Sequence, residues 1–183
     1  MTYYAHINSH NILAGVDMSM LVQDEYGSDD VQNIEVSKTV YDNQDQYIYK
    51  NGKVVKNPNY NKEQLEKAKS EKYKEANDKA NEFLDKVALF ELSEDYHVEA
   101  TKENMNTFAT AAIGIERELI PYQEWTSKED NVRQLNLEQC LTISMGIGAI
   151  QSSVWNVQFI AYKTAIENAE TIAEVERINI NYD

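Results

Sequence analysis

The chain has 183 residues, of which 42% are hydrophobic and 10% aromatic, a composition typical of a folded domain rather than a disordered segment. Its 17 basic and 31 acidic side chains give a net charge of −14, which disfavours direct binding to the phosphates of nucleic acids. The single cysteine excludes an intrachain disulfide and a zinc site built from several thiolates.

The first residues lack the basic region and apolar run of a secretion signal. No stretch approaches the roughly 18 consecutive apolar residues that cross a bilayer. We therefore expect a soluble protein without a membrane partner.

Residues 1–60 are expected to form a small β-rich region. Short strands are predicted at 36–40, 46–50 and 53–56. Asn51-Gly52 lies between the last two, and because both residues tolerate a positive φ, the pair predicts a tight hairpin. The acidic segment 23–30 contains Gly27 and Ser28 and is expected to be a solvated loop.

A connecting amphipathic helix is predicted over about 61–91, directly after Asn57-Pro58-Asn59. Asn61 is the expected cap, with Gln64 at the spacing that lets a side chain reach back to it. Steps of four and three residues place one stripe on this helix: Lys69, Tyr73, Ala76, Ala80, Phe83, Val87 and Phe90. Two readings stay open, a helix that packs on its own chain and a self-associating coiled coil.

Residues 92–183 are predicted to form a helical module. A short strand is expected at 96–100, and polar residues between Trp125-Thr126 and 132–135 predict a turn between two short extended segments. Three helices are predicted, with their caps: 102–119 after Thr101, 137 to about 168 after Asn136, and 172–178 after Thr171. Gly146 and Gly148 are expected to permit another helix to approach the long helix closely, or to mark a bend in it.

These elements predict an α+β fold in three parts. They are a small β-rich region with a hairpin (1–60), a long connecting helix (61–91), and a C-terminal helical module with a short two-stranded hairpin (92–183).

The C-terminal module resembles a domain of bacteriophage proteins. PYQEWTSKEDNVRQLNLEQCLTISMGI at 121–147 and AYKTAIENAETIAEVERI at 161–178 are similar to an uncharacterised helical domain of phage tail-fibre and tail-accessory proteins. The tyrosine-rich YIYKNGKVVKNPNY at 47–60, followed by a Lys/Glu-rich helix, fits the same pattern. The resemblance covers roughly residues 92–180 most closely and implies a phage tail or virion protein, but no established activity.

Candidate catalytic and ligand-binding residues do not form a recognisable constellation. His6 and His10 have the spacing of helical metal ligands without a helical pattern, and His97 is expected to be an ordinary surface residue. Gly146-Ile147-Gly148 lacks the remainder of a phosphate-binding motif, and Cys140 is expected to be a buried structural thiol. We therefore expect no catalytic residues, no metal, no cofactor and no enzymatic activity. An enzyme is a third functional class, because an active site assembled from residues distant in sequence leaves no local pattern.

Two functions remain, both based on protein–protein interaction. The first is a phage tail or virion accessory or assembly protein that binds phage structural proteins and forms a homo-oligomer through Tyr73, Ala80, Phe83 and Val87. The second is an inhibitor of a host defence protein, whose acidic surface imitates nucleic acid. Its candidate contacts are Asp24, Glu25, Asp29 and Asp30 of the acidic segment 23–30, and a second acidic cluster at 91–103. The expected location is the virion or the host cytoplasm.

Overall fold

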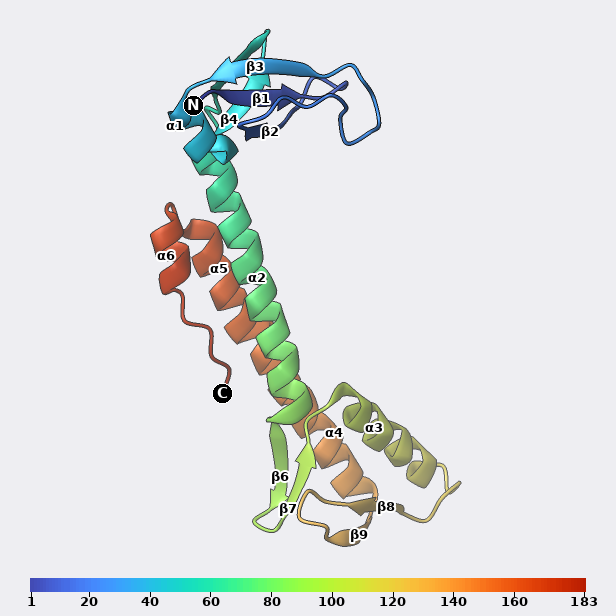
Figure 1. The fold of residues 1–183 in the computed structure, drawn as a ribbon. Coiled ribbons are helices and arrows are strands. Elements are labelled where there is room, and N and C mark those ends of the chain that lie inside the picture. The colour runs from blue at the N-terminus through green and yellow to red at the C-terminus, as the bar shows by residue number, and fades with distance from the viewer. The chain divides into compact units, whose positions relative to one another are not determined.

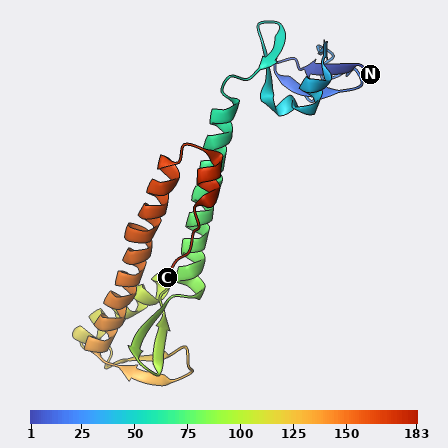
Figure 2. The same cartoon turned by 90° about the vertical axis from the view of Figure 1, so that its left-hand side faces the viewer.

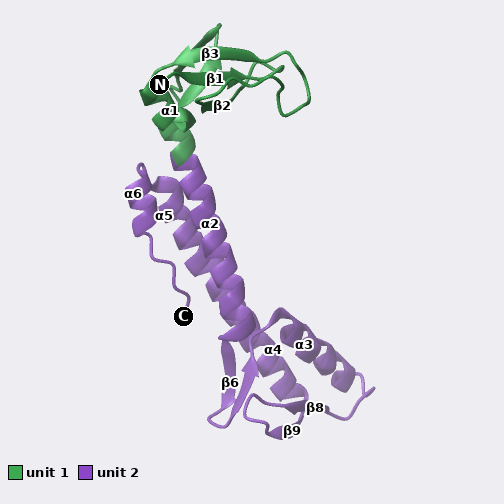
Figure 3. Ribbon diagram, viewed as in Figure 1, with its two compact units in different colours: residues 1–64 green, residues 65–183 purple.

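The computed structural model describes residues 1–183, which divide into two compact units, Met1–Gln64 and Leu65–Asp183 (Figure 3). The predicted α+β class is confirmed, because the chain contains a small N-terminal sheet, a long helix and a C-terminal helical module with hairpins (Figure 1).

The first unit is built on a three-stranded antiparallel sheet of order β2-β1-β3. Its strands are β1 (Tyr3–Ile7), β2 (Leu13–Asp17) and β3 (Gln32–Val36). A short helix α1 (Lys38–Asp42), a 3-10 turn η1 (Gln44–Gln46) and a hairpin of β4 (Tyr47–Lys50) and β5 (Lys53–Lys56) follow. Tyr3, Ala5 and Val16 form the small buried core of this unit.

The predicted strand at 36–40 is wrong. Strand β3 ends at Val36, and the Ser37 side chain accepts a hydrogen bond from the Val40 amide, which caps α1. A serine cap therefore outweighs the β-propensity of the residues around it. The hairpin at Asn51-Gly52 is confirmed, with φ angles of 53° and 78° at these two residues.

Helix α2 (Tyr60–Lys86) begins one residue before its predicted cap, Asn61. Asn57 organises the start of the helix instead, since its side-chain nitrogen donates to Glu63 at 2.8 Å and its carbonyl accepts from the Tyr60 amide. The helix also ends earlier than predicted, because Phe90 belongs to a strand.

The second unit contains two hairpins and several helices after α2. The hairpins are β6 (Leu89–Ser93) with β7 (Tyr96–Glu99), and β8 (Gln123–Thr126) with β9 (Val132–Leu135). The helices are α3 (Lys102–Glu116), α4 (Leu137–Ser152), the π-helical turn η2 (Ser153–Gln158), α5 (Phe159–Asn168) and α6 (Ile172–Arg177). Strand β6 was not predicted from the sequence, which placed the end of the connecting helix at about residue 91.

The three predicted helix caps in this unit are confirmed. The side chains of Thr101, Asn136 and Thr171 each accept a hydrogen bond from the backbone amide three residues later. The end of α3 was predicted less well. The helix stops at Glu116, and Glu118 adopts a left-handed φ of 59° while the Leu119 amide donates to the Gly114 carbonyl.

The helix predicted at 137–168 runs from α4 through η2 into α5, with different neighbours at its two ends (Figure 2). Residues Cys140, Ile143 and Ile147 of α4 are fully buried in the part that contacts α3 and β6. In α5, Phe159 packs against Tyr73 of α2 with ring centroids 5.3 Å apart. The π turn lies between these two packing regions.

The inner face of α2 is covered by its own chain. Ala76, Ala80 and Leu84 are buried in the same apolar core as Tyr182, whose hydroxyl donates to the Ala76 carbonyl at 3.0 Å. Burial raises the pKa of Tyr182 to about 12. At these residues, α2 therefore packs against its own chain.

Candidate interaction surfaces

The predicted interaction stripe on α2 is not a continuous exposed surface. Ala80 is fully buried. Phe83 is half-buried, and its ring stacks with the Tyr182 ring, with the two ring centroids 6.5 Å apart. Val87 and Tyr73 remain accessible, with 60% and 40% of their surface exposed. A contact of these four residues with another chain stays a prediction, and Ala80 would have to be uncovered to make one.

The acidic loop of the first unit is held by hydrogen bonds to Asp24. This carboxylate accepts from the Ser9 amide at 2.9 Å, the Ser9 hydroxyl at 2.5 Å and the amides of Tyr26 and Ser28, both at 2.9 Å. These donors, led by the Ser9 hydroxyl, hold the pKa of Asp24 well below its usual range. Asp24 therefore orders the loop.

The other three acidic candidates lie at the surface of this loop. Glu25 accepts a hydrogen bond from the buried Asn8 side chain at 2.7 Å. Asp29 and Asp30 are exposed and form no ion pair. Of the four acidic candidates, these two therefore have carboxylates that are available to another protein.

Replacing Asp24 with asparagine is expected to loosen this loop, because a neutral amide is a weaker acceptor and its nitrogen would face donors. Amide hydrogen exchange should accelerate at Tyr26 and Ser28, and Asp29→Asn should serve as the unaffected control. Unchanged exchange at these amides in the Asp24 variant would contradict the role assigned to the carboxylate.

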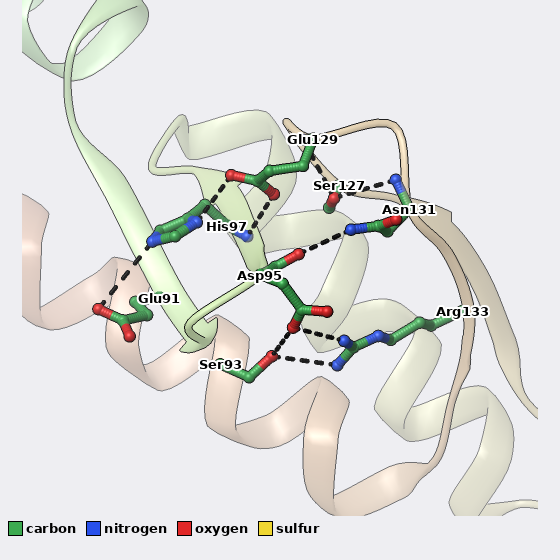
Figure 4. Close-up of polar contacts among 8 residues, drawn as sticks. All are labelled: Glu91, Ser93, Asp95, His97, Ser127, Glu129, Asn131 and Arg133. Atoms are coloured by element: carbon green, nitrogen blue, oxygen red, sulfur yellow. Dashed lines mark hydrogen bonds and ion pairs between the residues drawn. The ribbon is translucent and has the colours of Figure 1, made fainter.

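A polar cluster joins the two hairpins of the second unit, and we call it the hairpin junction (Figure 4). The Glu129 carboxylate accepts from the His97 amide at 3.0 Å and lies 2.7 Å from Nδ1 of the same histidine. Nε2 of His97 lies 4.0 Å from Glu91 on the other side of the ring. The imidazole is thus held between two carboxylates.

Arg133 makes the second half of the junction. Its guanidinium donates to Asp95 at 2.8 Å and to the Ser93 hydroxyl at 3.1 Å, and it lies over the Tyr96 ring at 4.5 Å. Asn131 adds a hydrogen bond to the Asp95 carbonyl. The Ser127 hydroxyl accepts from the amides of Glu129 and Asn131 and so closes the β8–β9 turn. The junction therefore fastens one hairpin to the other.

Sequence reasoning missed this cluster. His97 was expected to be an ordinary surface residue, whereas its side chain is only 25% exposed. Its partner Glu129 is 32 positions away, and no local pattern signals such a pairing.

We expect Glu129→Gln to lower the thermal midpoint of the second unit at neutral pH, because the His97 amide and ring would lose a charged acceptor. The hydrogen bond from the His97 amide is the main reason that the pKa of Glu129 falls from 4.5 to about 2. Because the folded-state pKa is the lower one, the stabilisation is complete above about pH 4.5 and is lost as the pH falls towards 2. Melting curves at several pH values should therefore converge for variant and wild type in acid. A midpoint difference that persists at pH 2 would argue against this interaction.

The remaining candidate metal ligands and nucleophile are two histidines and the cysteine. His6 and His10 belong to no cluster of three or more His, Cys, Asp or Glu side chains suited to a metal ion, since the structure contains none. Nδ1 of His6 lies 2.8 Å from the side-chain oxygen Oδ1 of Asn33, and Nε2 is buried without a hydrogen-bond partner. Cys140 is fully buried as predicted, and burial raises the pKa of its thiol.

Gly146 shows why the long helix contains a glycine at this point. A Cβ there would overlap the edge of the Phe90 ring and lie 2.7 Å from its Cζ atom. The predicted close approach of a helix is therefore wrong in its partner: at Gly146 the close neighbour is an aromatic side chain from β6, and Gly148 has only an ordinary contact with Met105.

Two open apolar hollows lie on the second unit. The larger, about 800 Å³, runs along α3 and is lined in part by Thr107, Ala111, Gly114, Leu119 and Ile120. The smaller, about 450 Å³, lies over the first turns of α4 and includes Leu137, Leu141 and Met145. Exposed apolar hollows of this kind are typical of surfaces that bind other proteins.

Comparisons with protein-family models, curated proteins and solved structures give no match. The resemblance to the phage tail-fibre domain therefore stays a prediction. None of the helices combines the length and apolar composition needed to cross a bilayer.

Proposed function

We propose that the chain is a bacteriophage tail or virion accessory or assembly protein that acts by binding other proteins. The observation that carries this proposal is the apolar groove along α3. Leu119 at its edge has 74% of its surface exposed, and Ile120 and Tyr122 beside it are 36% and 39% exposed. Burying such side chains against a partner is favourable by about 25 cal/mol per Å² of apolar surface.

The sequence resemblance supplies the class of partner, which is a phage structural protein. The groove supplies a surface on which such a partner would bind. The net charge of −14 disfavours a nucleic-acid partner.

The test uses a phage that carries the gene. Purified particles should contain the chain, or particle assembly should fail when its gene is deleted. Leu119→Asp should reduce incorporation or assembly, because a carboxylate would enter the apolar contact. Val132→Asp is the matched control, since Val132 is 61% exposed on β9 and does not line the groove. Normal particles that lack the chain and form without it would refute the proposal.

The alternative is an inhibitor of a host defence protein, and exposed carboxylates without a basic partner favour it. Asp29 and Asp30 of the first unit are such residues, as is Glu94 of the second. An inhibitor of this kind would form a salt-sensitive complex with a nucleic-acid-binding host protein. Asp29→Asn with Asp30→Asn should weaken that complex, and unchanged phage growth on defence-bearing hosts after gene deletion would count against it.

A further inference from the structure

The longest uncharged stretch of the chain lies on α4, η2 and α5. No Asp, Glu, Lys or Arg occurs between Glu138 and Lys163, although 26% of the residues in the whole chain are charged. A buried helix would explain this composition, but only one side of the helix is buried. Cys140, Ile143, Ile147, Val154 and Phe159 lie in the core.

The opposite side is exposed and consists of apolar and small polar residues. Leu141, Met145, Val157 and Ile160 have 45%, 73%, 64% and 47% of their surface exposed. The exposed residues between them are small or neutral: Ala149, Ser152, Ser153 and Asn156. In Figure 2, α2 lies on one side of α5, and no element covers the other side. We call this surface the neutral face.

We propose that two copies of the chain associate through the neutral face, with their α4–η2–α5 helices antiparallel. A protein with a net charge of −14 repels its own copies at most points of contact, and that repulsion is weakest where the surface carries no charge. A twofold interface must also be self-complementary. Hydroxyl and amide groups meet this requirement because each both donates and accepts hydrogen bonds.

The two ends of the neutral face fix the direction of the helices. Glu138 is the last charged residue before the face and Lys163 is the first after it, so an antiparallel pairing brings these opposite charges together at both ends. Within its own chain Lys163 lies 3.8 Å from the Glu167 carboxylate, and both of these side chains are partly exposed. A parallel pairing would instead place Glu138 beside Glu138. The two residues are 25 positions apart, or about 37 Å along a helix.

The same register places apolar groups over the smaller hollow. If Glu138 meets Lys163 of the second copy, Leu141 meets its Ile160. The hollow lined by Leu137, Leu141 and Met145 is then covered by the exposed Val157 and Ile160 of the other copy, and this contact occurs twice by symmetry. Ala149 and Ser153 lie near the centre, where small residues allow two helices to approach closely.

The dimer rests on the proposed protein-binding function, because it names a second copy as the partner, but it is tested in solution rather than in particles. Sedimentation velocity over a range of concentrations should show a dimer for the wild-type chain. Met145→Glu should weaken association roughly 100-fold or more, since two unpaired charges would enter the apolar contact. Ile113→Glu is the control, because Ile113 is 50% exposed on α3 and lies outside the neutral face. Thermal melts should show that both variants fold.

A charge exchange tests the antiparallel register. Glu138→Lys and Lys163→Glu should each weaken the dimer about fivefold, because two exposed ion pairs become repulsive. An equimolar mixture of the two variants should recover wild-type association, since each heterodimer restores both pairs. A wild-type monomer at every concentration, or a Met145→Glu variant as dimeric as wild type, would overturn the proposal. A dimer without recovery in the mixture would overturn the antiparallel arrangement. A monomeric result would leave the particle test of function unaffected.

Discussion

Phe108→Ala is expected to lower the free energy of unfolding of the second unit by about 3–5 kcal/mol, the usual loss when a buried aromatic side chain is removed. Phe108 is fully buried on α3, and its ring lies 4.8 Å from the Trp125 ring of β8. The substitution therefore removes an aromatic contact between α3 and this hairpin. Denaturant unfolding monitored by tryptophan fluorescence measures the loss.

Ile113→Ala provides the control on the same helix. Half of the Ile113 surface is exposed, so its truncation should change the unfolding free energy by no more than about 0.5 kcal/mol. A loss below about 1 kcal/mol for Phe108→Ala would show that the α3 core is not packed as described.

Gly146→Ala should destabilise the second unit by about 1–3 kcal/mol, as expected for an overpacked core. The new methyl group would overlap the Phe90 ring, and this clash outweighs the roughly 1 kcal/mol that alanine adds to helix stability. Gly148→Ala is a close control, because its Cβ would make an ordinary 3.5 Å contact with Met105 Sδ. That variant should be neutral or slightly more stable than wild type.

A double variant separates the clash from other effects of the substitution at Gly146. When Phe90 is first replaced by leucine, the added cost of Gly146→Ala should shrink, and thermal or denaturant unfolding of the four chains gives the coupling energy. Equal effects at Gly146 and Gly148, or strict additivity with Phe90→Leu, would contradict the close packing.

The parts of the fold that sequence predicted well are controlled by local chemistry. Asn51-Gly52 has the positive φ angles that its hairpin needs, and Thr101, Asn136 and Thr171 each satisfy backbone amides within one helical turn. Such signals require only neighbouring residues, and they can therefore be read before the tertiary structure is known.

The errors concern residues whose environment is set by distant parts of the chain. Phe90 continues the stripe of α2 in sequence, yet it pairs with Val98 and packs against Gly146, 56 positions away. The hairpin junction likewise depends on partners more than 30 positions apart, such as His97 with Glu129. Asp24 belongs to a segment with the composition of a solvated acidic loop, but its carboxylate accepts hydrogen bonds from Ser9, 15 positions earlier. Periodicity and composition do not contain these pairings.

The π turn at Ser153–Gln158 has a consequence for how the chain tolerates change in length. A helix of uniform pitch keeps the angular relation between its two halves fixed, so the orientation of α5 would follow from that of α4. The wider turn adds residues without a matching rotation, which lets α4 pack against α3 while Phe159 of α5 packs against Tyr73 of α2. Loss of a single residue from this turn would rotate α5 by about 100°. Phe159 would then turn away from Tyr73, although every helix of the unit retained its sequence.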